Sequence, residues 1–275
     1  MKLKRSERLI DMTQRLLDIP HTLISLTTFT ALYQSAKSSI SEDIAIIKKT
    51  FEKQGVGIIR TVPGAAGGVI FVPKIKREQA LAAAEKLKEQ MNDASRLLPG
   101  GYIYLSDLLA KPDVLHDLGK MIASAYEDKK IDAVMTVATK GVPIAQTVAN
   151  YLNVPFVIVR RDSKITEGST VSINYVSGSS SRVEKMELSK RTLAGGSNVL
   201  IVDDFLKAGG TINGMRSLIQ EFDSTTAGAV VFCESGVSNH NVTDYSSIIK
   251  ITEIDTEAQT IKAELGNFFD THEFL

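Results

Sequence analysis

The 275-residue chain contains a single cysteine, Cys233, so no disulfide can form within it, and this favours a reducing compartment such as the cytosol. No apolar run approaches the ~20 residues that a helix needs to span a bilayer. No apolar segment follows the charged N-terminus, as it would in a signal peptide. The four histidines and the cysteine show no metal-ligand spacing. We therefore expect a cytoplasmic protein without a membrane partner and without a metal site of its own.

The chain also lacks net charge, with 32 basic and 32 acidic residues, but the two signs are unevenly distributed. Residues 1–77 hold thirteen Lys and Arg against six Asp and Glu, and residues 78–275 carry the opposite excess. A basic segment in an otherwise acidic chain is typical of nucleic-acid binding. Chance variation between two soluble domains is the alternative.

Apolar periodicity in residues 1–74 predicts three helices followed by a β-ribbon. The helices are expected at 5–18, at 26–33 and from a cap at Ser38 or Ser39 onward; the strands are expected at 56–62 and 69–72 around a glycine-rich turn. Three helices and a ribbon resemble a winged helix-turn-helix. Such a module can also bind proteins, so a protein-interaction role stays open.

In a winged helix-turn-helix, the third helix enters the major groove by its N-terminal end. Short polar and basic side chains there suit phosphates and base edges, although serines at a helix start are often only caps. The residues expected at DNA lie at the helix end (Lys37, Ser38, Ser39, Ser41), in the N-terminal arm (Lys2, Lys4, Arg5, Arg8) and in the wing (Arg60, Gly67, Gly68).

The most informative segment of the C-terminal part is 199–211. Residues 199–202 predict a buried parallel strand that ends before Asp203 and Asp204; a glycine pair, 209–210, then leads into a helix. Backbone N–H groups at a helix N-terminus can receive phosphate, and carboxylates accept hydrogen bonds from ribose hydroxyls. Because neighbouring strand residues face opposite ways, we expect both carboxylates to reach one ligand only beyond the strand end. An ordinary turn with a solvated acidic pair is the alternative.

The whole string resembles the phosphoribosyl pyrophosphate (PRPP) motif of type I phosphoribosyltransferases. The resemblance implies that Asp203 and Asp204 hold the ribose hydroxyls, that a Mg²⁺ ion can bridge them to PRPP, and that the loop after them wraps the 5-phosphate. The residues implied in PRPP binding here are Asp203, Asp204, Phe205, Lys207, Ala208, Gly209, Gly210 and Thr211. The enzymes usually have a small residue and a threonine where Lys207 and Ala208 stand, which favours a pocket that holds PRPP without turning it over.

From residue 75 onward the chain alternates strands and helices, which predicts an α/β fold with a mostly parallel sheet. By position, the turn after a strand at 133–137 resembles the pyrophosphate loop of the same family, and the polar excursion 166–181 resembles its hood and flexible loop. Further candidate PRPP ligands are Tyr102, Ala138, Thr139, Lys140, Gly141, Arg160, Lys164, Ser177 and Ser179. A solvated lysine, a mobile hairpin and core packing of Tyr102 are the alternatives.

The entire chain resembles the purine operon regulators of Gram-positive bacteria. The segments that carry this resemblance are residues 36–43, 61–68, 98–102 and 166–179, together with the PRPP motif. The resemblance implies a winged-helix DNA-binding domain at 1–74 and a phosphoribosyltransferase-like effector domain at 75–275. It also implies a homodimer that binds double-stranded DNA at purine gene promoters and senses PRPP. PRPP weakens DNA binding in repressor members, whereas other members activate. An active purine phosphoribosyltransferase with an appended regulatory module is the rival hypothesis.

Overall fold

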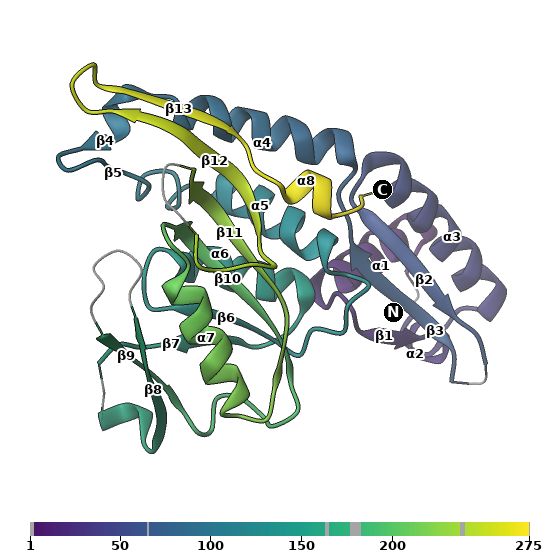
Figure 1. The fold of residues 1–275 in the computed structure, drawn as a ribbon. Coiled ribbons are helices and arrows are strands. Elements are labelled where there is room, and N and C mark those ends of the chain that lie inside the picture. The colour runs from purple at the N-terminus through teal and green to yellow at the C-terminus, as the bar shows by residue number, and fades with distance from the viewer. Residues whose placement is uncertain (1–2, 65, 163–164, 177–182, 237–239, 275) are drawn as a thin grey trace.

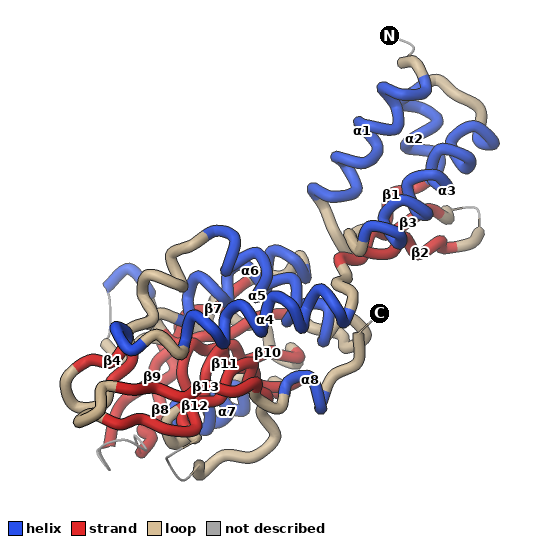
Figure 2. The backbone as a smooth tube through the Cα atoms, turned by 90° about the horizontal axis from the view of Figure 1, so that it is seen from above, coloured by secondary structure: helices blue, strands red, loops and turns tan. Residues whose placement is uncertain are grey.

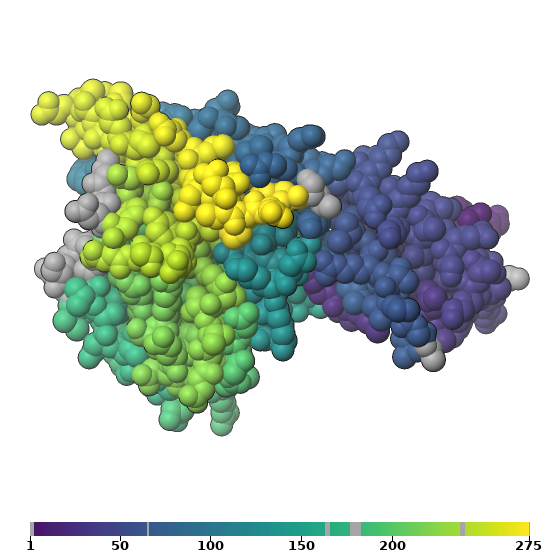
Figure 3. All heavy atoms as spheres, turned by 45° about the vertical axis from the view of Figure 1, so that its right-hand side comes forward, coloured from purple at the N-terminus to yellow at the C-terminus, as the bar shows by residue number. Residues whose placement is uncertain are grey.

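The computed structural model describes the chain except for residues 1–2, 65, 163–164, 177–182, 237–239 and 275. Two bodies follow one another along the sequence, and the smaller N-terminal one projects from one end of the larger (Figures 1 and 2). In the space-filling view of Figure 3 the N-terminal body, coloured purple to blue, occupies one end of an elongated molecule. The predicted boundary after residue 74 falls between the last strand of the small body and the helix that follows it.

The N-terminal body is a three-helix unit with a small antiparallel sheet of order β1-β3-β2. Its elements are α1 (Arg5–Asp18), β1 (Leu23–Ser25), α2 (Leu26–Tyr33), α3 (Lys37–Gln54), β2 (Gly57–Val62) and β3 (Gly68–Pro73). The helical periodicity has its physical basis in one core, in which Met12, Leu16, Phe29, Ile44 and Phe51 are buried together. The predicted helices and ribbon are confirmed; the three-residue strand β1 was not predicted.

The start of α3 differs from the prediction. Ala36 is its N-cap and Lys37 its first residue, so neither Ser38 nor Ser39 caps the helix. Both serines therefore lie within the first turn, where Ser38 is exposed and Ser39 half-buried. Ser38 and Ser39 follow the cap position by two and three residues, because the helix already begins at Lys37, directly after the extended Ala36.

The C-terminal body is built on a six-stranded sheet of order β13-β12-β11-β10-β6-β7, in which β13 alone is antiparallel to its neighbour. Its strands are β6 (Ala133–Val137), β7 (Phe156–Val159), β10 (Asn198–Leu206), β11 (Thr225–Ser235), β12 (Ser246–Asp255) and β13 (Thr260–Leu265). Alternation along β10 sends Leu200 and Val202 into one core, and Val199 and Ile201 into another on the opposite face. The predicted mostly parallel sheet is confirmed.

Helices cover one face of this sheet, and a helix with a hairpin covers the other. The first face packs against α4 (Arg77–Met91), α5 (Pro112–Ala125), α6 (Gly141–Leu152) and the short α8 (Phe268–Thr271). The second packs against α7 (Gly210–Gln220) and the antiparallel pair β8 (Thr170–Val176) and β9 (Val183–Ser189). Four short elements complete the body: the 3-10 helices η1 (Ala94–Arg96) and η2 (Ile165–Glu167), and the paired strands β4 (Leu97–Leu98) and β5 (Tyr102–Ile103). Among the described residues, no helix combines the length and hydropathy that a bilayer crossing requires.

The two bodies meet through ion pairs and hydrogen bonds around the end of α5. Glu127, whose side chain is only 2% exposed, is paired with Arg60 of β2 at 2.6 Å and with Lys74 at 2.5 Å. Asn153, just after α6, donates its side-chain N–H to Thr22 Oγ1 at 3.0 Å. A buried carboxylate held by two cations from the other body gives this joint a defined geometry, because breaking either pair leaves charge uncompensated.

Candidate functional site

The carboxyl ends of β6 and β10 bring the two predicted anion-binding loops together. β6 leads through residues 138–140 into α6, and β10 leads through residues 207–209 into α7. These two strands are neighbours and parallel, so both helix N-termini open at the same edge of the sheet. Ligands of open α/β sheets bind at this edge.

The acidic pair lies inside β10, which corrects the predicted strand end. Pairing with β11 continues through Asp203 opposite Val231 to Leu206 opposite Glu234, so the longer β11 carries β10 four residues beyond Val202. Pairing with β6 stops at Ile201. At the two aspartates, β10 therefore has no strand partner among the described residues on the side of loop 138–141. Both aspartates border that loop, although they still lie within the strand.

The two carboxylates differ in their surroundings. Asp203 is 5% exposed, and its Oδ1 accepts the backbone N–H of Asp204 at 3.0 Å. Burial, and then the charge of Asp204, raise the pKa of Asp203 well above its ordinary value. Asp204 is half-buried, and its Oδ1 accepts the Thr139 hydroxyl at 3.2 Å. Asp204 is thus the more exposed of the two carboxylates at this edge, and Asp203 is the more buried one, although both border loop 138–141.

Gly141 allows loop 138–141 to approach β10 closely. A Cβ at this position would lie 2.6 Å from Thr136 Oγ1 and 2.7 Å from Asp203 Oδ1, so any side chain would displace the loop or the aspartate. Gly141 is also the first residue of α6, with the exposed Lys140 as its N-cap. The N–H groups of a helix start and a lysine together suit an anion, although those of Gly141 and Val142 are here engaged by Thr139 at 3.5 and 3.4 Å.

Loop 207–211 has the same design. Gly209 is the N-cap of α7 with φ +94°, a left-handed conformation that glycine adopts without strain. Gly210 and Thr211 begin the helix, so their N–H groups belong to its unpaired first turn. Lys207 is exposed beside them, whereas Ala208 is buried and offers no hydroxyl.

A cavity of about 280 Å³ lies beside these loops. The predicted residues Lys140, Asp204, Phe205, Lys207 and Tyr102 all line it. The Tyr102 ring is 65% exposed, and the Lys207 ammonium lies 5.6 Å from its centroid. The fold therefore brings residues from three separate segments of the sequence to one cavity, and Tyr102 is not a core residue.

Other residues that line this cavity were not predicted from the sequence. Ser235 at the end of β11, Ile254 of β12 and the glycines 100–101 line the same cavity. Arg161 also acts on the acidic pair, since its charge opposes the rise in the pKa of Asp203. The only feature of the sequence that indicates this role for Arg161 is its position directly after strand β7.

Some predicted ligands are not placed at the cleft. The Arg160 guanidinium forms an ion pair with Glu167 at 3.0 Å, and its backbone pairs with Glu187. Arg160 is therefore engaged by the hairpin segment, which corrects the prediction that it is free for a ligand. Lys164, Ser177 and Ser179 lie outside the described residues.

The predicted DNA-binding surface is best formed at the N-terminal end of α3, where Lys37, Ser38 and Ser41 are exposed. Lys4 is exposed at the start of α1, and Lys2 lies outside the described residues. Asp43 is fully buried beneath this end and takes ion pairs from Arg5 at 2.9 Å and Arg8 at 2.8 Å.

These ion pairs correct part of the predicted arm. Arg8 is only 11% exposed and is held by a buried carboxylate, so it positions α1 against α3 and is not a free phosphate ligand. Arg5 keeps half of its side chain exposed and can reach outward.

The wing residues also differ from the prediction. Arg60 points to Glu127 at the joint between the two bodies, where a duplex contact would break a short ion pair. Gly68 is buried opposite Ser25, and a Cβ there would lie 2.1 Å from the Ile24 carbonyl oxygen. Gly68 therefore serves the close approach of β1 to β3. Only Gly67, half-buried at the turn, keeps the predicted position.

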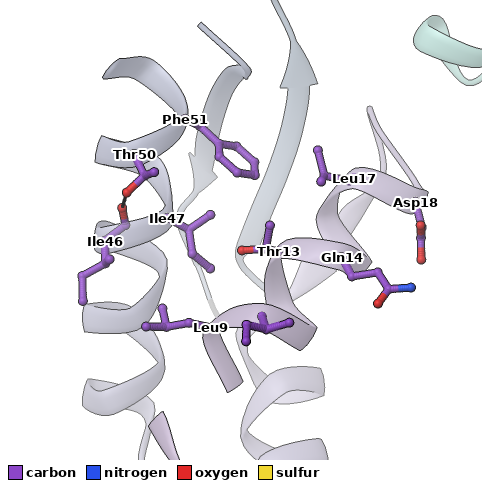
Figure 4. Close-up of a pocket in the computed structure, with 10 residues that line it drawn as sticks. Leu9, Thr13, Gln14, Leu17, Asp18, Ile46, Ile47, Thr50 and Phe51 are labelled. Atoms are coloured by element: carbon purple, nitrogen blue, oxygen red, sulfur yellow. Dashed lines mark hydrogen bonds between the residues drawn. The ribbon is translucent and has the colours of Figure 1, made fainter. Parts of the chain in front are cut away.

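A second cavity, of about 500 Å³, lies between α1 and the C-terminal half of α3 (Figure 4). It is an apolar groove, and its lining residues are Leu9, Ile10, Thr13, Gln14, Leu17, Asp18, Ile46, Ile47, Thr50 and Phe51. Ile10 is 70% exposed, and Leu17 and Ile46 are also exposed on its edges. Its residues from α3 all belong to the C-terminal half of that helix, so the groove shares no residue with the predicted DNA surface.

Comparison with known proteins supports both halves of the architecture. The family model described as "Bacterial purine repressor, N-terminal" matches residues 4–73, and "Phosphoribosyl transferase domain" matches residues 105–265. A probable purine biosynthesis transcriptional regulator PurR of Streptococcus pneumoniae is 58% identical over 272 residues, covering 98% of this chain and 99% of its own. The purine biosynthesis transcriptional repressor PurR of Bacillus subtilis is 55% identical over 269 residues, covering 98% and 94%.

A likeness among solved structures extends to the larger body. The crystal structure of adenine phosphoribosyltransferase from Thermoanaerobacter pseudethanolicus aligns with a TM-score of 0.53 at 23% identity, over 60% of this chain and 98% of that one. At this identity the likeness concerns the fold alone.

Proposed function

We propose that this chain, which belongs to the PurR family of bacterial purine biosynthesis regulators, binds DNA at purine gene promoters and changes its DNA affinity when PRPP fills the cleft. The observation that carries the proposal is the edge of the sheet at β6 and β10. There an acidic pair lies between two helix N-termini, each with its own lysine. We place this activity in the cytoplasm, where both PRPP and the chromosome are found.

Each part of PRPP has a complementary group in the cleft. Asp204 would accept hydrogen bonds from the ribose hydroxyls. The start of α7 with Lys207 would receive the 5-phosphate, and the start of α6 with Lys140 the pyrophosphate. The two aspartates offer the hard oxygen donors that Mg²⁺ prefers, so a magnesium ion arriving with PRPP would neutralise charge there.

A binding role without turnover is supported by loop 207–211. Ala208 is buried where the enzymes carry a threonine hydroxyl, and Lys207 adds a cation that retains phosphate. Incubation with radiolabelled purine bases and PRPP separates the proposal from its rival. Formation of nucleotide at enzyme-like rates would establish a phosphoribosyltransferase instead.

α6 offers a direct mechanical connection between ligand and DNA-binding domain. Its first residue, Gly141, lies in the ligand loop, and Asn153 directly after its last turn bonds to Thr22 of the other domain. A helix of 12 residues is ~18 Å long and moves as a rigid unit. A change in loop 138–141 would therefore reach the joint through Asn153, which lines the same surface pocket as Glu127. Linkage requires PRPP to favour one arrangement of this joint over another.

We expect Lys37→Ala to weaken binding to promoter and to unrelated DNA alike, because a lysine at the start of α3 contacts phosphate and not a base pattern. Loss of one phosphate contact should reduce the slope of log affinity against log salt by about 0.9. Fluorescence anisotropy at several salt concentrations measures this slope. Lys130→Ala, which removes an exposed lysine of the larger body, is the matched control. An unchanged slope for Lys37→Ala would point to a protein-binding N-terminal module.

We also propose that the apolar groove between α1 and α3 is covered by the same groove of a second copy. On α1, Asp18 lines the groove and Glu7 lies one turn before Ile10; on α3, Lys49 and Lys53 lie one turn after Ile46 and Thr50. A two-fold axis parallel to the helices sets α1 of one copy on α3 of the other and pairs these opposite charges.

Ile10→Asp should convert this homodimer to monomer, because it buries a charge within the apolar interface. Sedimentation velocity measures the change, and Ile19→Asp, at an exposed apolar residue outside the groove, is the control. A wild-type monomer, or a dimer that Ile10→Asp leaves intact, would contradict this interface.

A further inference from the structure

The segment 240–245 lies directly against the proposed 5-phosphate loop, although more than 25 residues separate the two in sequence. The backbone N–H of Asn241 donates to the Ala208 carbonyl at 2.8 Å. Asn213 of α7 donates its side-chain N–H to the Asn241 carbonyl, also at 2.8 Å. Arg216, one turn further along α7, donates to the Asp244 carbonyl at 2.8 Å. The loop and the helix that follows it are thus both bonded to one external segment.

Val242 completes this contact by packing on the bare face of Gly209. A Cβ on Gly209 would lie 2.3 Å from Val242 Cγ1, and Val242 itself is buried. The glycine at the helix start is therefore required twice, once by its positive φ and once by the valine above it. The shape of the phosphate loop depends on where residue 242 is held.

The segment is in turn anchored to the end of β11 by a short side-chain network. The Tyr245 hydroxyl donates to Glu234 Oε2 at 2.5 Å and lies 2.6 Å from Nδ1 of His240. His240 Nε2 lies 2.7 Å from the Ser235 carbonyl oxygen. Glu234 is buried and pairs in register with Leu206, at the end of the strand that carries the acidic pair. Burial and this carboxylate raise the pKa of Tyr245, so its hydroxyl stays a donor at neutral pH.

We propose that His240 and Tyr245 are positioning residues for phosphate recognition: anchored on Glu234, they hold the 240–245 segment so that Asn241 and Val242 fix loop 207–211 in its anion-binding shape. No atom of the network needs to touch the ligand. This inference rests on the proposed PRPP site, and it names residues outside the PRPP string that set the affinity of that site. A pre-formed loop binds more tightly because its ordering cost is met before the ligand arrives.

The test removes one hydroxyl and keeps the ring. Tyr245→Phe should lower PRPP affinity about tenfold, equivalent to about 1.4 kcal/mol, while DNA affinity without PRPP stays at the wild-type value. Tyr151→Phe is a close structural match, because Tyr151 and His116 have the same 2.6 Å hydroxyl–Nδ1 distance and the same 74° ring angle as Tyr245 and His240. That control should leave PRPP affinity unchanged. Calorimetric affinity equal to wild type in Tyr245→Phe would overturn the proposal.

Hydrogen exchange tests the support independently of PRPP. The backbone N–H groups of residues 208–211 should exchange several-fold faster in Tyr245→Phe than in Tyr151→Phe, in ligand-free protein. Equal exchange would overturn the support role even if wild type binds PRPP. Conversely, a wild-type protein that binds no PRPP but shows this difference would overturn the proposed function and leave the structural support established.

A double-mutant cycle tests the Val242 contact. Gly209→Ala should lower PRPP affinity strongly, and the Val242→Ala background should recover part of the loss, because the nearest clashing atom, Val242 Cγ1 at 2.3 Å, is removed, while the Val242 Cβ contact at 2.6 Å and the φ strain remain. Strictly additive effects would contradict a direct contact between the two positions.

Discussion

Asp203→Asn should lower PRPP affinity at least tenfold and, in the same protein, raise the melting temperature at neutral pH. The loss of affinity follows because Asp203 and Asp204 together would offer oxygen donors to the Mg²⁺ that arrives with PRPP, and an uncharged amide is a weaker ligand for that ion. The gain in stability follows from burial, because Asp203 is 5% exposed and its pKa is raised by desolvation and by Asp204. The amide keeps the oxygen that accepts the Asp204 N–H and carries no charge.

The stability gain should depend on pH in a defined direction. Because the pKa of Asp203 is raised in the folded state, its stabilising contribution is complete below the unfolded value of about 4 and is lost as pH rises through the folded value. The melting temperature of Asp203→Asn minus that of wild type should therefore grow from pH 4 upward. Asp113→Asn, at an exposed carboxylate, is the control and should show no such trend. If Asp203→Asn binds PRPP with wild-type affinity, Asp203 does not contribute to the binding site.

Glu127→Gln should destabilise the protein and weaken the coupling between PRPP binding and DNA binding. Breaking a buried ion pair costs about 3 kcal/mol or more, since Lys74 is left 15% exposed without its partner. The half-exposed Arg60 loses less, because water screens it. With the joint loosened, the ratio of DNA affinities with and without PRPP should move toward one, while PRPP affinity itself stays near wild type.

Asp107→Asn separates the two effects. Asp107 pairs with the buried Arg96 at 2.7 Å within the larger body, away from the joint, so this variant should lose stability and keep the PRPP effect. Thermal melts and DNA binding with and without PRPP measure both quantities. A Glu127→Gln protein that keeps the full PRPP effect would exclude the joint as the route of coupling.

Local patterns in the sequence predicted most elements because each carries its own signal. The periodicities of α1 and β6 and the glycine pair before α7 are set by residues adjacent in the chain, and the structure places all three as predicted. The two helix N-termini meet at one edge because parallel neighbours must align their carboxyl ends, so the lysines at 140 and 207 were predictable as a pair.

What the sequence could not reveal depends on partners that are distant along the chain. β10 runs on to Leu206 because β11 is long enough to pair with it, which a local reading of the acidic pair cannot detect. Arg8 and Arg60 looked like free cations, because Asp43 and Glu127 are assigned to them only by the packing of helices and of domains. The support of the phosphate loop by Tyr245 was invisible for the same reason: it depends on a contact between segments that only the folded sheet brings together.

The most direct test of the account is the affinity of the full-length protein for a purine gene promoter, measured by fluorescence anisotropy at fixed salt across a PRPP titration. We expect a saturable change of at least about fivefold in affinity, equivalent to about 1 kcal/mol of coupling, with its midpoint shifted at least tenfold to higher PRPP in Asp203→Asn. Promoter affinity that stays constant up to millimolar PRPP in the wild-type protein would contradict it.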